Sequence, residues 1–324
     1  MKFRQLKYFI AVAEAPSLTK ATERLHIAQP ALSQNIKALE TDLGVQLFTR
    51  NRLGVALTDA GSGFLSHAYE IMRQIERARA SVQGLRDDIR GTVKIALPAS
   101  VCNVLAVPVQ EVVAEKYPGI DLTMEEGLSG TLAAAFKQGL FDVLVDFDAE
   151  DSDDLQIEPL IKEQLYFIHS RSMREVPDGD FDFRNLREYQ IVLPRSRHGL
   201  ARAVTSYARR AGIDLKPGLR TGSMHTAIKL VRAGLGSVVL PWSAIYDSLD
   251  SDIVAHKIVN PMMYRTVQML TSVSRPNSPA MRCVIDVIRH AVAEAHDNNR
   301  WRGELLLNPK DGVSPLPARG HGVA

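Results

Sequence analysis

Apolar residues recur at helical spacing through the start of the chain, and the breaks in that pattern constrain the fold more than any other feature. Residues 3–14 present one apolar face and predict an amphipathic helix. Pro16 ends this helix, and Ser17 is a good N-cap for a second one over residues 18–25. A short link then leads to a third helix, with Pro30 in its first turn. Two short helices joined by such a turn predict a helix-turn-helix.

The predicted third helix has an apolar face and a polar face. Its inward stripe, before Gly44 ends the helix, comprises Leu32, Ile36, Leu39 and Leu43. Its outward face carries Gln29, Ser33, Gln34 and Lys37. Glutamine can pair with adenine, serine can bond a phosphate or a base, and lysine can neutralise a phosphate. On periodicity alone, a plain three-helix bundle with a solvated polar face is an equal alternative.

Residues 47–58 read as two short strands around a tip between Asn51 and Gly54, with Arg50 and Arg52 near that tip. Such a hairpin can touch the DNA backbone or the minor groove beside a recognition helix. Lys and Arg outnumber Asp and Glu over the first 90 residues, whereas acids slightly outnumber bases in the rest. This distribution is compatible with nucleic-acid binding.

This region resembles the signature of the LysR-type transcriptional regulators. The resemblance rests on the stretch SLTKATERLHIAQPALSQNIKALETDLGVQLFTR, followed by VALTDAG. It implies a winged helix-turn-helix whose third helix enters the major groove, with a wing that begins at Thr49 and Arg50. The residues expected to contact DNA are Gln29, Pro30, Ser33, Gln34, Lys37, Thr49, Arg50 and Arg52.

Three positions depart from the family pattern. Ala28 stands where a capping Ser or Thr is frequent, which costs the third helix a cap worth ~1 kcal/mol. Gln34 replaces a frequent Arg, and Leu53 occupies a wing position that is often basic. These departures leave DNA binding intact, but the preferred DNA sequence does not follow from the pattern.

Residues 59–90 contain no proline and predict one long helix. Its apolar residues are spaced alternately four and three apart: Phe64, Ala68, Ile71, Ile75, Ala78, Val82, Leu85 and Ile89. This heptad seam favours a homodimer, as in the family's linker helix, and a helix packed on its own chain is the alternative. A dimer would present two recognition helices to inverted half-sites. Pairing of dimers through their C-terminal domains would give a homotetramer.

From Gly91 on, short apolar strands alternate with helices, which predicts an α/β domain with parallel strands. The pattern occurs twice, over residues 93–147 and 190–241, and the extended segments 160–171 and 264–272 could cross between the halves. Two α/β lobes joined by two strands resemble the periplasmic-binding-protein fold. The family likeness continues through FKQGLFDVLV, LYFIHSR and LVRAGLGSVVLP.

The predicted domain boundaries follow from these patterns. They are a winged helix-turn-helix over 1–58, a linker helix over 59–90, an effector-binding domain over 91–297 and a tail over 298–324. Lobe I is expected to comprise 91–161 and 266–297, and lobe II 162–265. The tail is rich in Pro, Gly and Ala and is predicted to be disordered. The helix over 102–116 is expected to be interrupted at Pro108.

Ligands of two-lobed folds bind in the crevice beyond the carboxyl ends of the strands. The residues expected there lie near helix N-termini: Ser100, Ser129, Gly130, Thr131, Arg195, Arg197, His198, Ser223, His225 and Thr226. Free N–H groups at helix N-termini favour a carboxylate or another anion, so we expect a small anionic metabolite. Alternatively, the Ser and Thr residues only cap helices, and His225 only forms part of the crevice wall.

Other function classes find little support. No GxSxG, HExxH or P-loop motif occurs, and Gly234 to Gly236 follow a helix where a dinucleotide site needs a strand. The histidines lack metal-ligand spacing, and Cys102 and Cys283 lie far apart, so neither a metal nor another cofactor is expected. The C-terminal half alone would fit a free solute-binding receptor, but the helix-turn-helix and the lack of a signal-peptide core argue against it.

The expected protein is therefore a cytoplasmic DNA-binding regulator and not an enzyme. Its expected partners are double-stranded promoter DNA, a small-molecule effector, a second copy of itself and RNA polymerase. A membrane is not among them, because no apolar run reaches ~18 residues. Within the family, its Gln-Pro-Ala-Leu-Ser and Ser-Gly-Thr segments resemble the nitrogen-assimilation-control-like members.

Overall fold

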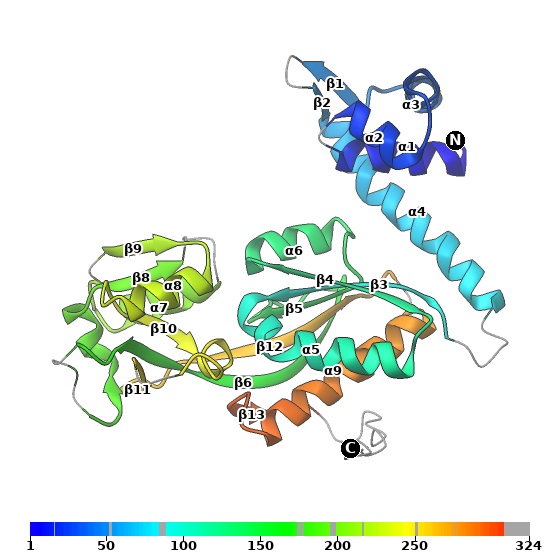
Figure 1. The fold of residues 1–324 in the computed structure, drawn as a ribbon. Helices are drawn as coiled ribbons and strands as arrows, with labels where there is room; N and C mark the ends of the chain where they lie inside the picture. Colours follow the sequence, from blue (N-terminus) through cyan, green and yellow to red (C-terminus); the bar gives the residue numbers. More distant parts are fainter. Residues whose placement is uncertain are drawn as a thin grey trace. The chain divides into compact units, whose positions relative to one another are not determined.

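The computed structural model describes residues 1–307 except 16, 52–53, 84–88, 174–175, 177, 195–198, 216, 250–251 and 276. Residues 1–87 and 137–140 fall in one unit, and residues 88–136 and 141–324 fall in the other. Figure 1 follows the chain through both units. Each unit has hydrophobic cores of its own.

The N-terminal unit contains three short helices, a hairpin and a long helix. These elements are α1 (Phe3–Glu14), α2 (Leu18–Leu25), α3 (Gln29–Leu43), β1 (Phe48–Asn51), β2 (Gly54–Leu57) and α4 (Asp59–Gln83). Ser17 caps α2 as predicted, since its hydroxyl accepts the Lys20 N–H. His26 takes a left-handed conformation that ends α2 before the turn to α3. Because β1 and β2 pair in an antiparallel hairpin, the winged helix-turn-helix is confirmed.

Phe9 lies at the centre of this unit's core and is fully buried. The rings of Phe48 and Phe64 lie 5.2 Å and 5.1 Å from its ring, so α1, the wing and α4 meet there. The first three members of the predicted inward stripe of α3 are buried as expected. Leu43 was predicted to be the fourth but is 36% exposed, at the last residue of α3.

Helix α4 begins at the expected residue, but the first part of its heptad seam packs within its own unit. Ala68 is fully buried there, and Phe64 and Ile71 pack against the same core. The prediction of one helix reaching residue 90 was wrong. Ile89 is not helical and instead packs against the core of lobe I.

The C-terminal unit consists of two α/β lobes joined by two long antiparallel strands, β6 (Leu155–Ser170) and β12 (Tyr264–Ser272). Lobe I contains β3 (Gly91–Pro98), α5 (Ala99–Lys116), β4 (Ile120–Gly127), α6 (Ser129–Lys137), β5 (Val143–Phe147), α9 (Pro279–Asp297) and β13 (Gly303–Leu305). Lobe II contains β7 (Phe181–Asp182), η1 (Phe183–Glu188), β8 (Ile191–Pro194), α7 (Gly199–Arg210), β9 (Pro217–Thr221), α8 (Met224–Arg232), β10 (Val238–Pro241), η2 (Trp242–Ala244) and β11 (Ile253–Val259).

The strand pairing explains how the two lobes are connected. β3 pairs in parallel with β4 and β5, and β8 pairs in parallel with β9, as the alternating pattern predicts. The main sheet runs β4-β3-β5-β12-β6-β11-β7. β6 pairs with β12 along its first part and with β10 and β11 along its last part. One strand therefore belongs to both lobes.

Two further predictions were wrong. The tail was predicted to be disordered over 298–324, but in its first part, residues 298–307, Trp301 is fully buried and β13 pairs with β6, whereas residues 308–324 lie outside the described residues. Disorder was inferred from composition, whereas this segment is ordered by contacts with a strand far away in the sequence. Helix α5 runs through Pro108 without a break, because the proline itself is buried and Leu105 and Val109 pack into the core of lobe I.

Candidate functional site

The outward face of α3 is the candidate nucleic-acid interface. Of the residues predicted to contact DNA, Gln29, Pro30, Gln34, Lys37 and Thr49 are exposed and Ser33 is half-buried. An open groove of about 720 Å³ runs between α3 and the hairpin, and Ser33, Gln34 and Lys37 line it. Helix α3 thus presents polar side chains on one face while the other face packs into the core. As the sequence indicated, Ala28 gives α3 no side-chain cap.

Glu40 fixes the hairpin relative to α3. Its carboxylate accepts the backbone N–H groups of Leu47 and Phe48, at 2.8 Å and 3.2 Å. Sequence reasoning assigned Glu40 no role, although an acid in the last turn of a helix that precedes a hairpin is a signal for such a contact. Thr49 pairs with Ala56 across the hairpin. The Arg50 side chain and the whole of Arg52 lie outside the described residues.

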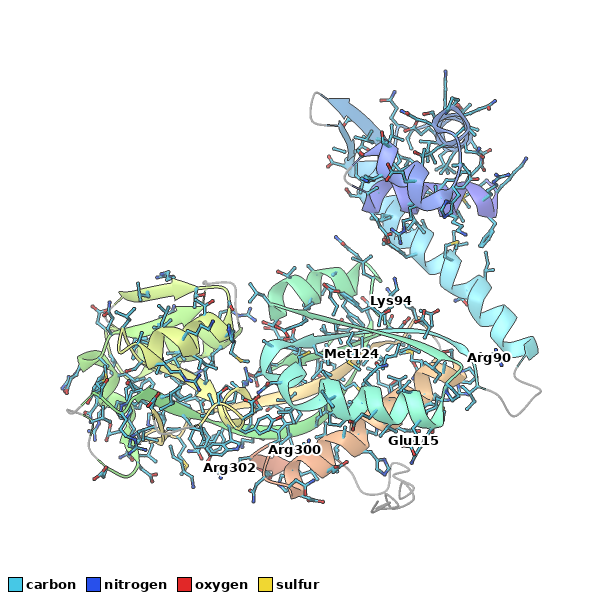
Figure 2. The ribbon with its side chains drawn as sticks, in the orientation of Figure 1. Arg90, Lys94, Glu115, Met124, Arg300 and Arg302 are labelled. Carbon is cyan, nitrogen blue, oxygen red and sulfur yellow. The ribbon has the colours of Figure 1, made fainter. Side chains whose placement is uncertain are left out.

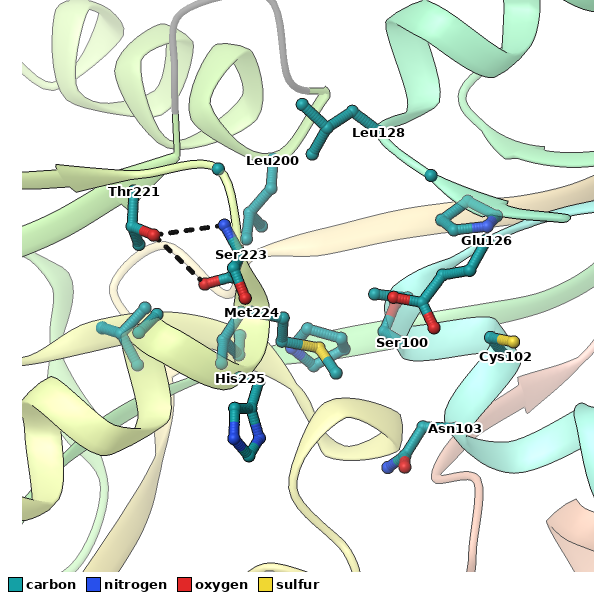
Figure 3. Close-up of a pocket in the computed structure, with 18 of the residues that line it drawn as sticks. Ser100, Cys102, Asn103, Glu126, Leu128, Leu200, Thr221, Ser223, Met224 and His225 are labelled. Carbon is teal, nitrogen blue, oxygen red and sulfur yellow. Dashed lines mark hydrogen bonds between the residues drawn. The ribbon is translucent and has the colours of Figure 1, made fainter. Parts of the chain in front are cut away.

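A second candidate site lies between the lobes of the C-terminal unit. A pocket of about 450 Å³ separates the start of α5 and the end of β4 from the segment that leads into α8. Figure 3 shows Ser100, Cys102, Asn103 and Glu126 on one side and Thr221, Ser223, Met224 and His225 on the other. The Thr221 hydroxyl accepts the Ser223 N–H at 3.1 Å, which fixes this turn. An interlobe crevice was predicted, and the pocket occupies that place.

The pocket contains only some of the predicted effector residues. Ser100, Ser223 and His225 line it. Ser129, Gly130, Thr131 and Thr226 are absent from its lining, which corrects the prediction that all these segments meet there. Arg195, Arg197 and His198 lie outside the described residues.

Two of the predicted effector residues that do not line the pocket have structural roles. Ser129 is buried, and its hydroxyl accepts the Gly199 N–H at 3.2 Å, so it joins the start of α6 in lobe I to the start of α7 in lobe II. Thr226 supplies the backbone N–H that Ser223 accepts as N-cap of α8. Capping was the alternative explanation for these residues, and it applies to Ser223.

A buried ion pair that sequence reasoning missed lies beside the pocket. The Arg265 Nε donates to Glu163 at 2.6 Å, and its Nη2 donates to the Ser100 hydroxyl at 2.8 Å. The guanidinium carbon also lies 3.6 Å from the centre of the Phe147 ring. Arg265 lines the pocket, and its Nη1 donates no hydrogen bond to any described residue. Its planar donor group is therefore held in place beside the cavity.

The other oxygen of Glu163 completes this network. It accepts the Ser243 hydroxyl at 2.9 Å and the Trp301 indole N–H at 2.7 Å. Glu163 and Arg265 are register partners on β6 and β12, so the ion pair joins the two crossing strands. Opposite charges on two strands predict an ion pair only when the register of those strands is known, so the sequence alone does not show this pair.

Two titratable groups in or beside the pocket have shifted pKa values, Cys102 and Asp146. Burial, then the charge of Glu126 and a hydrogen bond to it, raise the pKa of the Cys102 thiol to about 11, which keeps it protonated and unreactive at neutral pH. Burial also raises the pKa of Asp146 to about 6, although the Phe147 N–H and the charges of Arg202 and Arg265 oppose this.

In the described part of the chain, no group of three or more His, Cys, Asp or Glu side chains could hold a metal ion. Over the same residues, no helix has both the length and the apolar character that crossing a membrane requires.

The chain matches two protein-family models. Residues 3–62 match the bacterial regulatory helix-turn-helix protein, lysR family, and residues 86–293 match the LysR substrate binding domain. The second match alone covers more than half of the chain.

Individual relatives agree with these matches. The nitrogen assimilation regulatory protein Nac of Klebsiella aerogenes is 29% identical over 302 residues, which are 93% of this chain and 98% of that protein. Nac of Escherichia coli is 30% identical over 245 residues, covering 75% and 79%. CbnR, solved in complex with its target DNA, is 25% identical with a TM-score of 0.65 and covers 90% of this chain and 100% of that one.

A further solved structure supports the fold. A full-length OxyR variant from Pseudomonas aeruginosa has a TM-score of 0.75 at 23% identity, and the match covers 95% of this chain and 99% of that one. The fold, both family models and these relatives lead to one conclusion: the chain belongs to the LysR family of DNA-binding transcriptional regulators, which are not enzymes, and carries that family's effector-binding domain.

Proposed function

We propose that this regulator binds promoter DNA as a homodimer, with α3 in the major groove and the β1–β2 hairpin beside it. The exposed polar face of α3, opposite a buried apolar face, carries this proposal. Gln29 and Gln34 read bases, since glutamine can bond adenine with both of its polar atoms. The contacts with the DNA backbone come from Pro30, Ser33, Lys37, Thr49, Arg50 and Arg52.

We further propose that the interlobe pocket binds a small metabolite that carries a carboxylate. Met224 and His225 stand at the N-terminus of α8 and line the pocket, where backbone N–H groups without a helical partner favour an anion. The unused Nη1 of Arg265 adds a charged donor. Glu126 lies on the opposite side, so the same effector needs a hydrogen-bond donor facing that carboxylate.

Effector binding is proposed to act through the two lobes. A ligand that contacts both lobes favours one degree of closure over another in proportion to its difference in affinity. In the cytoplasm, this bias changes how the dimer or a tetramer engages the promoter and RNA polymerase. The outcome is activation or repression of the adjacent genes.

The effector proposal is tested by a melting screen of the full-length protein against organic acids, amino acids and inorganic anions. A ligand at 100 times its Kd stabilises the folded state by ~2.7 kcal/mol, which a melting shift detects. Ser223→Ala and Glu126→Gln should each reduce this melting shift. Thr131→Val is the matched control, because Thr131 is exposed and outside the pocket. The proposal would be contradicted if every ligand found were neutral or cationic, or if the ligands stabilised both variants as much as the wild type.

A further inference from the structure

A second concave surface of the C-terminal unit carries a concentration of positive charge. Lys162, Lys257 and Arg302 line an open groove of about 620 Å³. The other lining residues are Gln164, Tyr166, Tyr264, Gly303 and Glu304. Arg302, labelled in Figure 2, follows α9 and precedes β13. Nothing in the DNA-binding or effector proposals uses this groove.

The strand register explains why these residues meet. Side chains alternate along a strand, so Lys162, Gln164 and Tyr166 share the face of β6 opposite to the buried Glu163. Lys257 of β11 pairs with Tyr166. Tyr264 of β12 pairs with Gln164, and Glu304 of β13 pairs with Lys162. The groove is therefore built across four strands and faces away from the ion pair beside the effector pocket.

Two of the three cations, Lys162 and Arg302, lie against aromatic rings. The Lys162 ammonium lies 5.0 Å from the centre of the Tyr264 ring. The Arg302 guanidinium carbon lies 3.4 Å from the centre of the Trp242 ring. Among the described residues, no carboxylate forms an ion pair with any of the three cations. Contacts with rings orient a cation without neutralising its charge.

We propose that this groove binds a multiply charged phosphate group of the pyrophosphate type. Three cations face one carboxylate, that of Glu304, so the lining carries a surplus of positive charge that a singly charged anion would leave unbalanced. The planar donor group of arginine matches two phosphate oxygens, and lysine acts as a point charge beside it.

The proposed site also spans the connection between the lobes. Lys257 belongs to β11 of lobe II, whereas Arg302 lies between α9 and β13 of lobe I. An anion that bonds both cations restrains the motion of one lobe relative to the other. It does so on the face of β6 opposite to the effector pocket. The groove is thus a second ligand site, independent of the carboxylate proposed for the first.

The test is calorimetric titration of the full-length protein with pyrophosphate at constant ionic strength. Lys257→Gln and Arg302→Gln should each weaken binding about tenfold, because each removes a charge-assisted hydrogen bond. Lys229→Gln is the matched control, since it removes an exposed lysine elsewhere in lobe II and should leave the affinity unchanged. Lys257→Arg keeps the charge and should retain most of the binding.

The results distinguish this groove from other phosphate-binding surfaces of the protein, including the DNA-binding unit. No measurable binding at millimolar pyrophosphate, or equal affinity in wild type and both Gln variants, would overturn the proposal. Citrate binding as tightly as pyrophosphate would overturn the choice of phosphate. Tighter binding of ATP than of pyrophosphate would identify a nucleotide as the source of the phosphate group, and the reverse order would identify the inorganic ion.

Discussion

Glu163 is a buried carboxylate whose hydrogen-bond donors come from three distant parts of the chain. It is fully buried, and its two oxygens accept hydrogen bonds from Arg265, Ser243 and Trp301. A buried carboxylate is tolerated when its charge and its hydrogen bonds are both satisfied. The sequence shows the charges of Glu163 and Arg265 but not the register that makes them partners. Long-range polar contacts of this kind were therefore missed, whereas the α3 face followed from helical period alone.

Arg265→Ala should lower the free energy of unfolding by about 3–5 kcal/mol, because it leaves the Glu163 charge buried without a partner. The matched control is Arg184→Ala, which breaks an ion pair with Asp182 whose arginine side chain is 68% exposed. Exposed pairs contribute about 0–1 kcal/mol. Denaturant unfolding of both variants measures the difference. Equal losses would show that the buried network is not specially stabilising.

The raised pKa of Asp146 predicts that the stability of the protein depends on pH. Its pKa in the folded protein is raised to about 6 from an ordinary value of 3.8, chiefly by burial. Its contribution to stability is therefore fully present below pH 3.8 and is lost as the pH rises through about 6.

Asp146→Asn removes this loss, since the amide stays neutral at every pH. The variant should be more stable than wild type above pH 7 by roughly 1–3 kcal/mol, and the difference should vanish below about pH 4. Melting curves across this range check the prediction, with the exposed Asp121→Asn as control. A gain that persists unchanged at acid pH would show that burial of the charge is not its cause.

At the scale of elements, the sequence predicted what local periodicity and caps determine. The helices α1 to α3 and the parallel strand pairs followed from spacing, proline and serine positions. Three strands were missed, β7, β11 and β13. Strands β11 and β13 pair with β6, and β7 pairs with β11, so they depend on long-range pairing and not on a clear alternating pattern. The helix α4 was predicted too long, since Ile89 packs on lobe I.

The junction between the wing and α4 depends on close packing at one glycine. A Cβ on Gly61 would lie 2.0 Å from the Leu47 carbonyl oxygen, whereas a Cβ on Gly63 would meet nothing within 4 Å. Both glycines lie in α4, so they form a matched pair.

Gly61→Ala should destabilise the N-terminal unit by at least about 1–3 kcal/mol, because backbone atoms must move to admit the methyl group. Gly63→Ala should instead stabilise it by roughly 0.5–1 kcal/mol, since alanine favours the helix. Thermal unfolding of the two variants tests this. Similar effects of the two substitutions would contradict the packing at Leu47.

At the scale of the whole molecule, the two-domain organisation and the family followed from the sequence, but the membership of the effector pocket did not. Ser223 and His225 were identified from helix starts, whereas Glu126 and Arg265 were not. Which strand ends face a crevice depends on how the lobes fold together, and helix starts alone do not show this.

Dimerisation through α4 is now expected to depend on the later part of the seam, because Ala68 is already buried within its own unit. Aspartate at both Ile75 and Val82 would place like charges together at a symmetric interface. Sedimentation should then detect monomers, or oligomers smaller than those of the wild type. Gln74→Asp, an exposed position beside the seam, is the control. Oligomers of native size in the double variant would exclude this helix as the interface.

The central claim is that α3 reads DNA sequence through its polar face, and the affinities of Gln29→Ala for a selected target site and for random DNA test it most directly. The account predicts a loss of about 1–3 kcal/mol on the selected site and a much smaller loss on random DNA. Lys37→Gln should weaken both and lower the salt slope by about one, while Gln110→Ala, exposed in the other unit, should change neither. An equal loss on both DNAs for Gln29→Ala would contradict the claim.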